Sequence, residues 1–384
     1  MSGSSTRVVS FGMLAGARLS KLLPGRLPGD RPFLFAGGVH HALMCDNHAV
    51  VYGIGYGNVR SQPSFNAEWI TGLRVLGMVN DPSPTRRLVG FSAGRVHSAL
   101  HVRDVGKPDE ILLWGSSPHG QCADDVAVRE GTAKNDAGGR LVLGGADREI
   151  AQVACGLDHT VALGSSGAVY TWGWNADGQL GLSAGGSKRA PGERQRVERQ
   201  PRAVAGVAGA THVATSGDFT LALTARGDVL AWGNSEYAQC FAVADRAPAV
   251  AQMSAPAAMA RPVGIAAGYA FGLVLDEDGA VWRWGAGAAV GSAAPLATPT
   301  RIGGLPPIAR IAASGQHAVM VARDGSGVFG IGSNADGKLG LSADIDSTAE
   351  PKEIFVAGAA EEIAQVALGR TFTIISTTSA AAQA

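Results

Sequence analysis

Histidine is the residue type of this chain whose spacing first suggests chemistry. One short sequence motif recurs seven times, and its central position is occupied in turn by His41, His97, His159, Phe219, Phe271, His317 and Phe372. Imidazole groups ligate metals and transfer protons. A metal site needs its ligands within a few ångströms of one another, whereas this pattern supplies one histidine per repeat. We therefore expect each histidine to be buried and bonded to a neighbouring backbone, with Phe filling the same volume elsewhere.

The repeat is most complete at Val153–Gly173, VACGLDHTVALGSSGAVYTWG. It reads as a buried strand, a step of small residues, a second strand, a glycine turn and a third strand that ends in an aromatic residue and Gly. The central positions are 46 to 62 residues apart. A period of about 50 residues indicates a propeller or a solenoid.

The seventh copy, Val366–Thr378, is not followed by a third strand. The segment Val8–Gly12, VVSFG, has the form of the missing strand. An N-terminal strand that completes the last blade would close the ring and remove the exposed sheet edge. We therefore predict an all-β fold, a single closed seven-bladed β-propeller over residues 7–378, with flexible tails at 1–6 and 379–384.

Composition narrows the classes of partner and compartment. Lys plus Arg equals Asp plus Glu at 32 each, so the chain lacks the basic excess typical of nucleic-acid binding. The four cysteines are far apart in sequence and form no Cys-x-x-Cys pair. This pattern favours reduced thiols in an intracellular compartment and predicts no zinc site, no other metal and no cofactor.

The N-terminus bears on localisation. The first 29 residues contain four basic residues and no acidic residue, as transit peptides do. Val8–Gly12 is needed as a strand, however, so we do not expect cleavage. Mitochondrion and cytoplasm or nucleus both stay open. No apolar run approaches the roughly 20 residues that span a bilayer.

A basic insertion is predicted at residues 183–203. Residues 187–202 carry a net charge of +4, six basic residues against two glutamates. Such a segment can dock the phosphate backbone of RNA or an acidic protein face, or it can be a solvated loop. Its candidate contacts are Lys188, Arg189, Arg194, Arg196, Arg199 and Arg202.

The long segment Tyr56–Arg87 contains a second candidate contact, Trp69, flanked by Phe65 and Ile70. Tryptophan is enriched at binding hot spots. Two interpretations are open: Trp69 anchors an interface, or it packs on the rim of the propeller.

The motifs together carry a family resemblance. The pattern x-A-x-G-x-x-H-x-x-A-L, the strand V-Y-x-W-G, and the segment N-A-D-G-x-L-G-L at Asn175–Leu182 and Asn334–Leu341 resemble the regulator of chromosome condensation family of seven-bladed propellers. Founding members of that family are guanine nucleotide exchange factors for the GTPase Ran. The resemblance implies that side chains beside the motif position, here His40, Asp158 and Asp218, form a GTPase-binding face.

The chain also departs from that family. It lacks a basic N-terminal tail, and the Asn-x-x-Gly-Gln-Leu segment is altered at Ser116–Ala123 and Gly285–Gly291. A related plant ultraviolet-B photoreceptor requires tryptophan within the motif, but Gly94–Ser98 and Gly156–Thr160 contain none. We exclude that role.

No nucleotide-binding or hydrolase motif is present in the sequence: no P-loop, no G-x-G-x-x-G between strand and helix, no G-x-S-x-G and no H-E-x-x-H. We therefore expect a protein that is not an enzyme. The predicted function is a protein-interaction scaffold, a subunit or assembly factor that holds the subunits of a larger complex by its rim loops. The alternative is a guanine nucleotide exchange factor for a small Ran-type GTPase.

Overall fold

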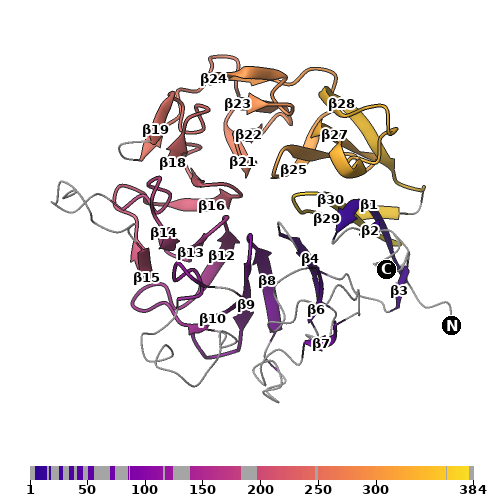
Figure 1. Cartoon of the computed structure of the whole chain (residues 1–384). Coiled ribbons are helices and arrows are strands. Elements are labelled where there is room, and N and C mark those ends of the chain that lie inside the picture. Colours follow the sequence, from indigo (N-terminus) through magenta and orange to yellow (C-terminus); the bar gives the residue numbers. More distant parts are fainter. Residues whose placement is uncertain are drawn as a thin grey trace.

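The chain folds as an all-β propeller in which antiparallel sheets surround a central axis, as seen in a computed structural model (Figure 1). The structure describes residues 5–14, 17–18, 26–28, 34–38, 41–45, 51–55, 70–73, 85, 87–115, 117–123, 139–182, 197–246, 250–359 and 361–379. Within these ranges the only helical element is a 3-10 turn, η2 (Ala335–Gly337). The predicted all-β propeller class is confirmed.

Six of the sheets use strands in chain order, starting from the strand closest to the axis. Three of them are β4 (Leu34–Gly37), β5 (His41–Cys45), β6 (Val51–Gly55) and β7 (Ile70–Leu73); β8 (Arg87–Ala93), β9 (His97–Arg103), β10 (Glu110–Gly115) and β11 (Gly139–Leu141); and β12 (Ile150–Cys155), β13 (His159–Gly164), β14 (Val169–Trp174) and β15 (Val197–Ala203). The next three are β16 (Ala210–Thr215), β17 (Phe219–Thr224), β18 (Val229–Ser235), β19 (Ala244–Arg246) and β20 (Ala251–Gln252); β21 (Pro262–Ala267), β22 (Phe271–Asp276), β23 (Val281–Gly287) and β24 (Ser292–Arg301); and β25 (Ile308–Ser314), β26 (His317–Ala322), β27 (Gly327–Ser333) and β28 (Ser347–Val356).

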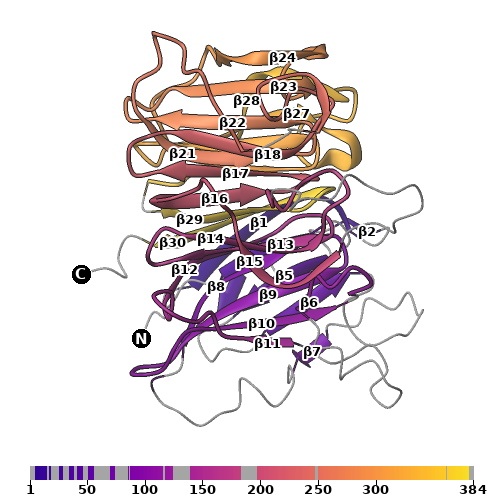
Figure 2. The ribbon, with the colours of Figure 1, turned by 90° about the vertical axis from the view of Figure 1, so that its left-hand side faces the viewer.

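A further sheet joins the two ends of the chain. It contains β29 (Glu361–Leu368), β30 (Phe372–Ser379), β1 (Ser5–Leu14), β2 (Ala17–Arg18) and β3 (Arg26–Pro28). β1 pairs with β30 antiparallel from Arg7↔Thr377 to Gly12↔Phe372. Figure 2 shows these strands lying together in the side view of the disc. The N-terminal strand β1 therefore lies beside β30, which carries the seventh motif residue, Phe372.

The second strand of each well-described sheet is buried along its whole length, as in β13, β17, β22 and β26. Both faces of such a strand pack against neighbouring sheets, which is why its sequence reads as a nearly continuous apolar run. Trp172, Trp232 and Trp284 lie within the third strands β14, β18 and β23 and are at most 1% exposed. Each indole N–H donates to a backbone carbonyl of the preceding sheet, at Gln121, Gln179 and Gln239 respectively, over 2.9–3.0 Å.

The residue that follows each of these tryptophans must be glycine, because two backbone segments lie very close together there. Gly173 pairs with His159 and has φ 107°, in the left-handed region. A Cβ there would lie 2.6 Å from the carbonyl oxygen of Asp158. Only glycine lets the third strand approach the turn before the motif position this closely.

The motif histidines bond a threonine side chain of the next sheet, a partner that the sequence did not indicate. Their Nε2 atoms lie 3.0–3.1 Å from threonine Oγ1 atoms, and the three pairs are His97 with Thr160, His159 with Thr220 and His317 with Thr373. The Thr160 and Thr220 hydroxyls donate to the carbonyls of Gln121 and Gln179, so in these two pairs Nε2–H must be the donor to the threonine oxygen.

This pairing explains why the motif position is His in some repeats and Phe in others. Where the motif residue is Phe219 or Phe271, the equivalent position of the next sheet is Gly272 or Ala318, which carry no hydroxyl. Both phenylalanines are at most 2% exposed. The motif position is therefore polar only where the adjacent sheet supplies a polar partner.

Removal of one threonine hydroxyl should show that a motif histidine depends on its polar partner in the next sheet. We expect Thr160→Val to lower the free energy of unfolding by about 1–3 kcal/mol, because the buried His97 Nε2–H is left without an acceptor. The double variant His97→Phe with Thr160→Ala copies the Phe271–Ala318 arrangement and should recover most of that loss. Urea unfolding measures both, with Thr298→Val on the exposed edge of β24 as control. A Thr160→Val variant as stable as the control would contradict the pairing.

Acid should lower the free energy of unfolding of the propeller through the same motif histidines. Burial lowers the pKa of His97, His159 and His317 to about 3, whereas an unfolded histidine titrates near 6.5. Between these values the unfolded chain binds protons that the folded chain does not, so stability falls as pH falls from about 6.5. The His97→Phe, Thr160→Ala variant should lose up to about 1.4 kcal/mol per pH unit of this slope. Urea unfolding at several values between pH 7 and 5 measures it, and an unchanged slope would contradict the assignment.

Candidate functional site

The turns between the first and second strands form one face around the axis, here called the axial face. In the described part of the chain these turns are residues 94–96, 156–158, 216–218, 268–270, 315–316 and 369–371. Backbone amides link one turn to the next: Arg95 N donates to Leu157 O over 3.2 Å, and Leu157 N to Gly217 O over 3.4 Å. Tyr269 N donates to Gly315 O over 2.7 Å. Side chains on these turns are thus held in fixed positions relative to one another.

Asp158, predicted as a partner contact, is neutralised within the axial face. The Arg95 guanidinium binds it with two donors, Nε to Oδ1 at 3.2 Å and NH2 to Oδ2. Asp158 is 7% exposed, whereas the Arg95 side chain is 43% exposed. The pair therefore presents mainly the guanidinium to solvent.

Asp218, on the adjacent turn, has no cationic partner among the described residues. Its Oδ1 accepts a 3.3 Å hydrogen bond from Gln179 Nε2. Burial raises the pKa of Asp218 to about 6, and the nearby carboxylates of Asp177 and Asp158 add to the effect. Asp218 is thus a half-buried carboxyl group whose negative charge is poorly compensated.

Gln179 belongs to a segment that recurs with different residues. Leu180 N donates to Asn175 Oδ1 over 3.0 Å, and Cys122 N donates to Ser117 Oγ over the same distance. Cys240 N likewise donates to Ser235 Oγ over 3.1 Å. The segment at 116–123, which the sequence suggested was altered, thus keeps the same turn with Ser in place of Asn.

Most of the other predicted contacts lie outside the described residues: His40, Trp69, Lys188, Arg189, Arg194 and Arg196. Arg199 and Arg202 are described, and they lie on β15, the strand of its sheet farthest from the axis (Figure 1). Residues 197–203 are therefore strand and not part of an insertion loop. Because β15 pairs with β14, these two arginines are separated from Asp158 and Asp218 by the width of the sheet.

Arg199 has a structural contact. A Cβ on Gly120 would lie 2.7 Å from Arg199 Cγ, so the arginine stem packs on the neighbouring sheet. Arg202 is exposed and remains available as a surface cation.

Metal and thiol chemistry have little support in the described part of the chain. No group of three or more His, Cys, Asp or Glu residues there is arranged to hold a metal ion. Cys122, Cys155 and Cys240 are buried and form no disulfide bond, and burial raises the pKa of Cys155 and of Cys240 to about 12. Those two thiols therefore stay protonated. The same residues include no helix with the length and apolarity to cross a membrane.

Sequence reasoning missed three residues of the axial face: Arg95, Gln179 and Tyr269. Arg95 and Tyr269 occupy the position two residues before the motif residue, where other repeats carry Leu157 or Arg370. Comparison of that position across the aligned repeats would have singled out both. Gln179 lies in the N-A-D-G-Q-L segment, but its contact with Asp218 follows only from the packing of two sheets.

The fold and the axial face define a class: a repeat propeller that presents one ring of turns at its axis. Comparison with known proteins specifies the family. Models described as "Regulator of chromosome condensation (RCC1) repeat" match residues 150–179, 210–239 and 166–223. The chain carries RCC1 repeats and belongs to the RCC1-like family.

One curated relative is the mouse (Mus musculus) RCC1-like G exchanging factor-like protein, 32% identical over 250 residues. The match covers 62% of this chain and 50% of the relative, so the chain spans about half the length of that protein.

Solved structures share the fold. Human WBSCR16 superposes with TM-score 0.77 at 24% identity, covering 97% of this chain and 99% of that chain. Prp20p from Saccharomyces cerevisiae, described with its binding to Gsp1p and histones, gives TM-score 0.75 at 21% identity, covering 98% of this chain and 92% of that chain.

The electrostatics of the axial face can be tested by titration. Asp177→Asn should lower the pKa of Asp218, because a neighbouring negative charge is removed. Arg95→Ala should raise the pKa of Asp218, because a cation is removed and Asp158 is left unpaired. Carboxyl ¹³C NMR measures both shifts, with Asp278→Asn, an exposed carboxylate at the far end of β22, as the control that should change nothing. Shifts of the same sign in the first two variants would contradict the arrangement.

Proposed function

We propose that this propeller is a protein-binding scaffold, a subunit or assembly factor of a larger complex, and that its axial face is the main binding surface. The observation that carries this proposal is Asp218, a half-buried carboxyl group next to Asp177 and Asp158 without a cationic partner in the described residues. Backbone bonds between turns hold the surface rigid, so a partner would not have to order it.

The chemistry of Asp218 indicates the kind of partner contact. A Lys or Arg side chain placed against it would gain from a carboxylate that is already partly removed from water. Arg95 already forms an ion pair with Asp158, so a cationic side chain of the partner would bind Asp218 on the neighbouring turn. The partner surface is accordingly proposed to be basic at this point.

A second candidate is guanine nucleotide exchange on a small Ran-type GTPase. The name of the mouse relative and the binding of Gsp1p by Prp20p favour it. The two functions would use the same face and differ in their response to nucleotide.

Ring closure is part of the proposal. A scaffold of this kind needs a surface that does not open, and we propose a closed ring of seven blades whose last blade is completed by β1. The pairing of β1 with β30 over six residue pairs supports it. The exposed ion pair between Arg7 and Glu361, 3.0 Å, lies beside that seam.

A pull-down distinguishes the two functions. Tagged full-length protein is incubated with extract of its native cells, washed with and without excess GTP, and its partners are identified by mass spectrometry. We expect a set of complex subunits that GTP does not release. Asp218→Asn should reduce their recovery at least about fivefold, the factor for one charge-assisted contact, whereas Asp278→Asn, exposed at the opposite end of the strands, should not.

Two results would change the conclusion. A GTPase that binds without nucleotide and is released by GTP would replace the scaffold by the exchange factor. Equal recovery by Asp218→Asn and the wild-type protein would move the binding surface away from the axial face. The cellular compartment of the identified partners would also indicate the localisation of this protein. We propose that it works inside the cell.

A further inference from the structure

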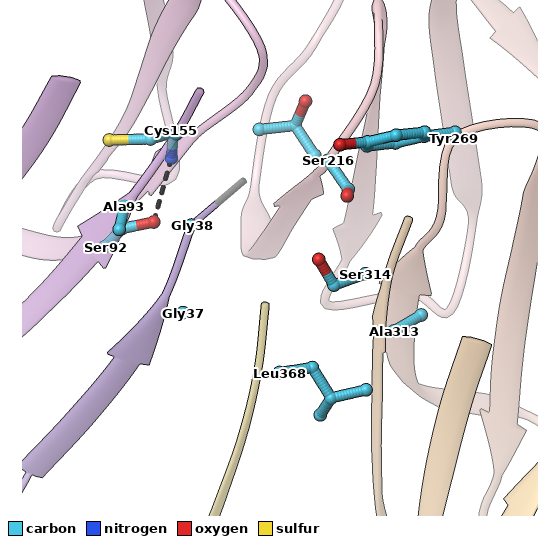
Figure 3. A pocket seen from close by; sticks show the side chains of 12 residues that line it. Gly37, Gly38, Ser92, Ala93, Cys155, Ser216, Tyr269, Ala313, Ser314 and Leu368 are labelled. Carbon is cyan, nitrogen blue, oxygen red and sulfur yellow. Dashed lines mark hydrogen bonds between the residues drawn. The ribbon is translucent and has the colours of Figure 1, made fainter. Parts of the chain in front are cut away.

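A small cavity lies on the propeller axis beneath the axial face, and every sheet contributes to its wall (Figure 3). Its volume is about 150 Å³. The lining residues come from the ends of the inner strands and the turns that follow: Gly37, Gly38, Ser92, Ala93, Gly94, Cys155, Thr215, Ser216, Tyr269, Ala313, Ser314 and Leu368. None of these residues carries a carboxylate, and most are small.

The polar atoms on one side of this cavity are hydroxyl groups with hydrogens to donate. Tyr269 OH is buried and has no hydrogen-bond partner among the described residues. Ser216 Oγ accepts the backbone N–H of Gly315 over 3.3 Å, which leaves its own hydrogen for a further partner. Figure 3 shows the side chains of Ser216, Tyr269 and Ser314 grouped on this side. A buried hydroxyl without a partner is costly, and a ligand that accepts its hydrogen removes that cost.

The charges that act on this group favour an anion. Burial raises the pKa of Tyr269 to about 12, so the hydroxyl keeps its proton and can donate. Arg370 acts most strongly on it among the neighbouring charges, followed by Asp218 and Arg95. Because Arg95 is paired with Asp158, Arg370 is the remaining cation on this side, and it faces the Asp218 carboxyl, whose pKa burial raises to about 6.

We propose that the axial cavity binds a small oxyanion, of the phosphate or carboxylate class, held by the hydroxyls of Tyr269, Ser216 and Ser314 and attracted by the charge of Arg370. The volume suits an ion of this size and excludes a nucleotide, since whole small-molecule pockets run to about 300–1,000 Å³. The site differs from the contact proposed for a protein partner, because its ligand lies among the hydroxyl groups that line the cavity and not against the Asp218 carboxyl. Binding would tie the inner strands together and stabilise the fold.

Thermal unfolding of the full-length chain tests the site. Sodium phosphate and sodium acetate are each titrated at constant ionic strength against sodium chloride. We expect the midpoint temperature to rise with phosphate or acetate beyond the chloride control. Tyr269→Phe removes only the hydroxyl and should weaken the apparent affinity about fivefold, the factor for one lost hydrogen bond. Tyr237→Phe, an exposed tyrosine outside the cavity, is the matched control and should bind as the wild-type protein does.

Further measurements distinguish binding of an anion from binding of a cation or of a neutral molecule in the cavity. Replacement of sodium by potassium should leave the stabilisation unchanged, and glycerol, a neutral polyol, should not reproduce it. Ser216→Ala gives a second variant that should also weaken binding. The proposal is overturned if neither anion stabilises the protein beyond chloride, or if Tyr269→Phe and Tyr237→Phe respond equally. It is likewise overturned if the effect follows the cation or if glycerol produces it.

Discussion

The packing of each sheet against the next near the axis is the constraint on which the rest of the structure depends. A sheet in this fold buries its second strand on both faces, so its stability comes from its neighbours. The contact is close at the motif position, where His159 reaches Thr220 of the adjacent sheet, and a Cβ on Gly94 would lie 2.4 Å from the carbonyl oxygen of Gly156 in the next sheet. A polar motif residue thus needs a hydroxyl opposite, and a phenylalanine needs none.

The same constraint creates the functional surface. Turns that must pass within hydrogen-bonding distance of one another are short and contain glycine, so the residues beside the motif position are the ones free to vary. They include Arg95, Asp158, Asp218, Tyr269 and Arg370. Backbone hydrogen bonds between neighbouring turns fix the spacing of these residues. Charge on this face can therefore differ between relatives while the fold stays the same.

The sequence predicted those parts of the structure that depend on short segments of the chain. The alternation within strands and the glycine turns are local features of each repeat. Together with their recurrence about every 50 residues, they correctly indicated the β-propeller and the RCC1-like family. The prediction was wrong where the outcome depends on contacts between sheets. Arg199 was placed in a loop but lies on β15. The threonine partners of the histidines were not predicted either. The turn at Ser117–Cys122 is kept because a serine hydroxyl can accept the same hydrogen bond as an asparagine oxygen.

By itself the sequence determined the repeated unit, because alternating burial and glycine turns are local properties of a chain segment. It also marked Asp158 and Asp218 as residues beside the motif position. Only the tertiary structure decided that Asp158 is neutralised by Arg95 and that Asp218 is not, since these residues come from different sheets. The axial cavity was also decided at that level, because it exists only where the inner strands of all the sheets converge. The physical reason is that electrostatic compensation and cavity shape are set by neighbours that lie far apart in sequence, 39 residues for Gln179 and Asp218 and 63 residues for Arg95 and Asp158.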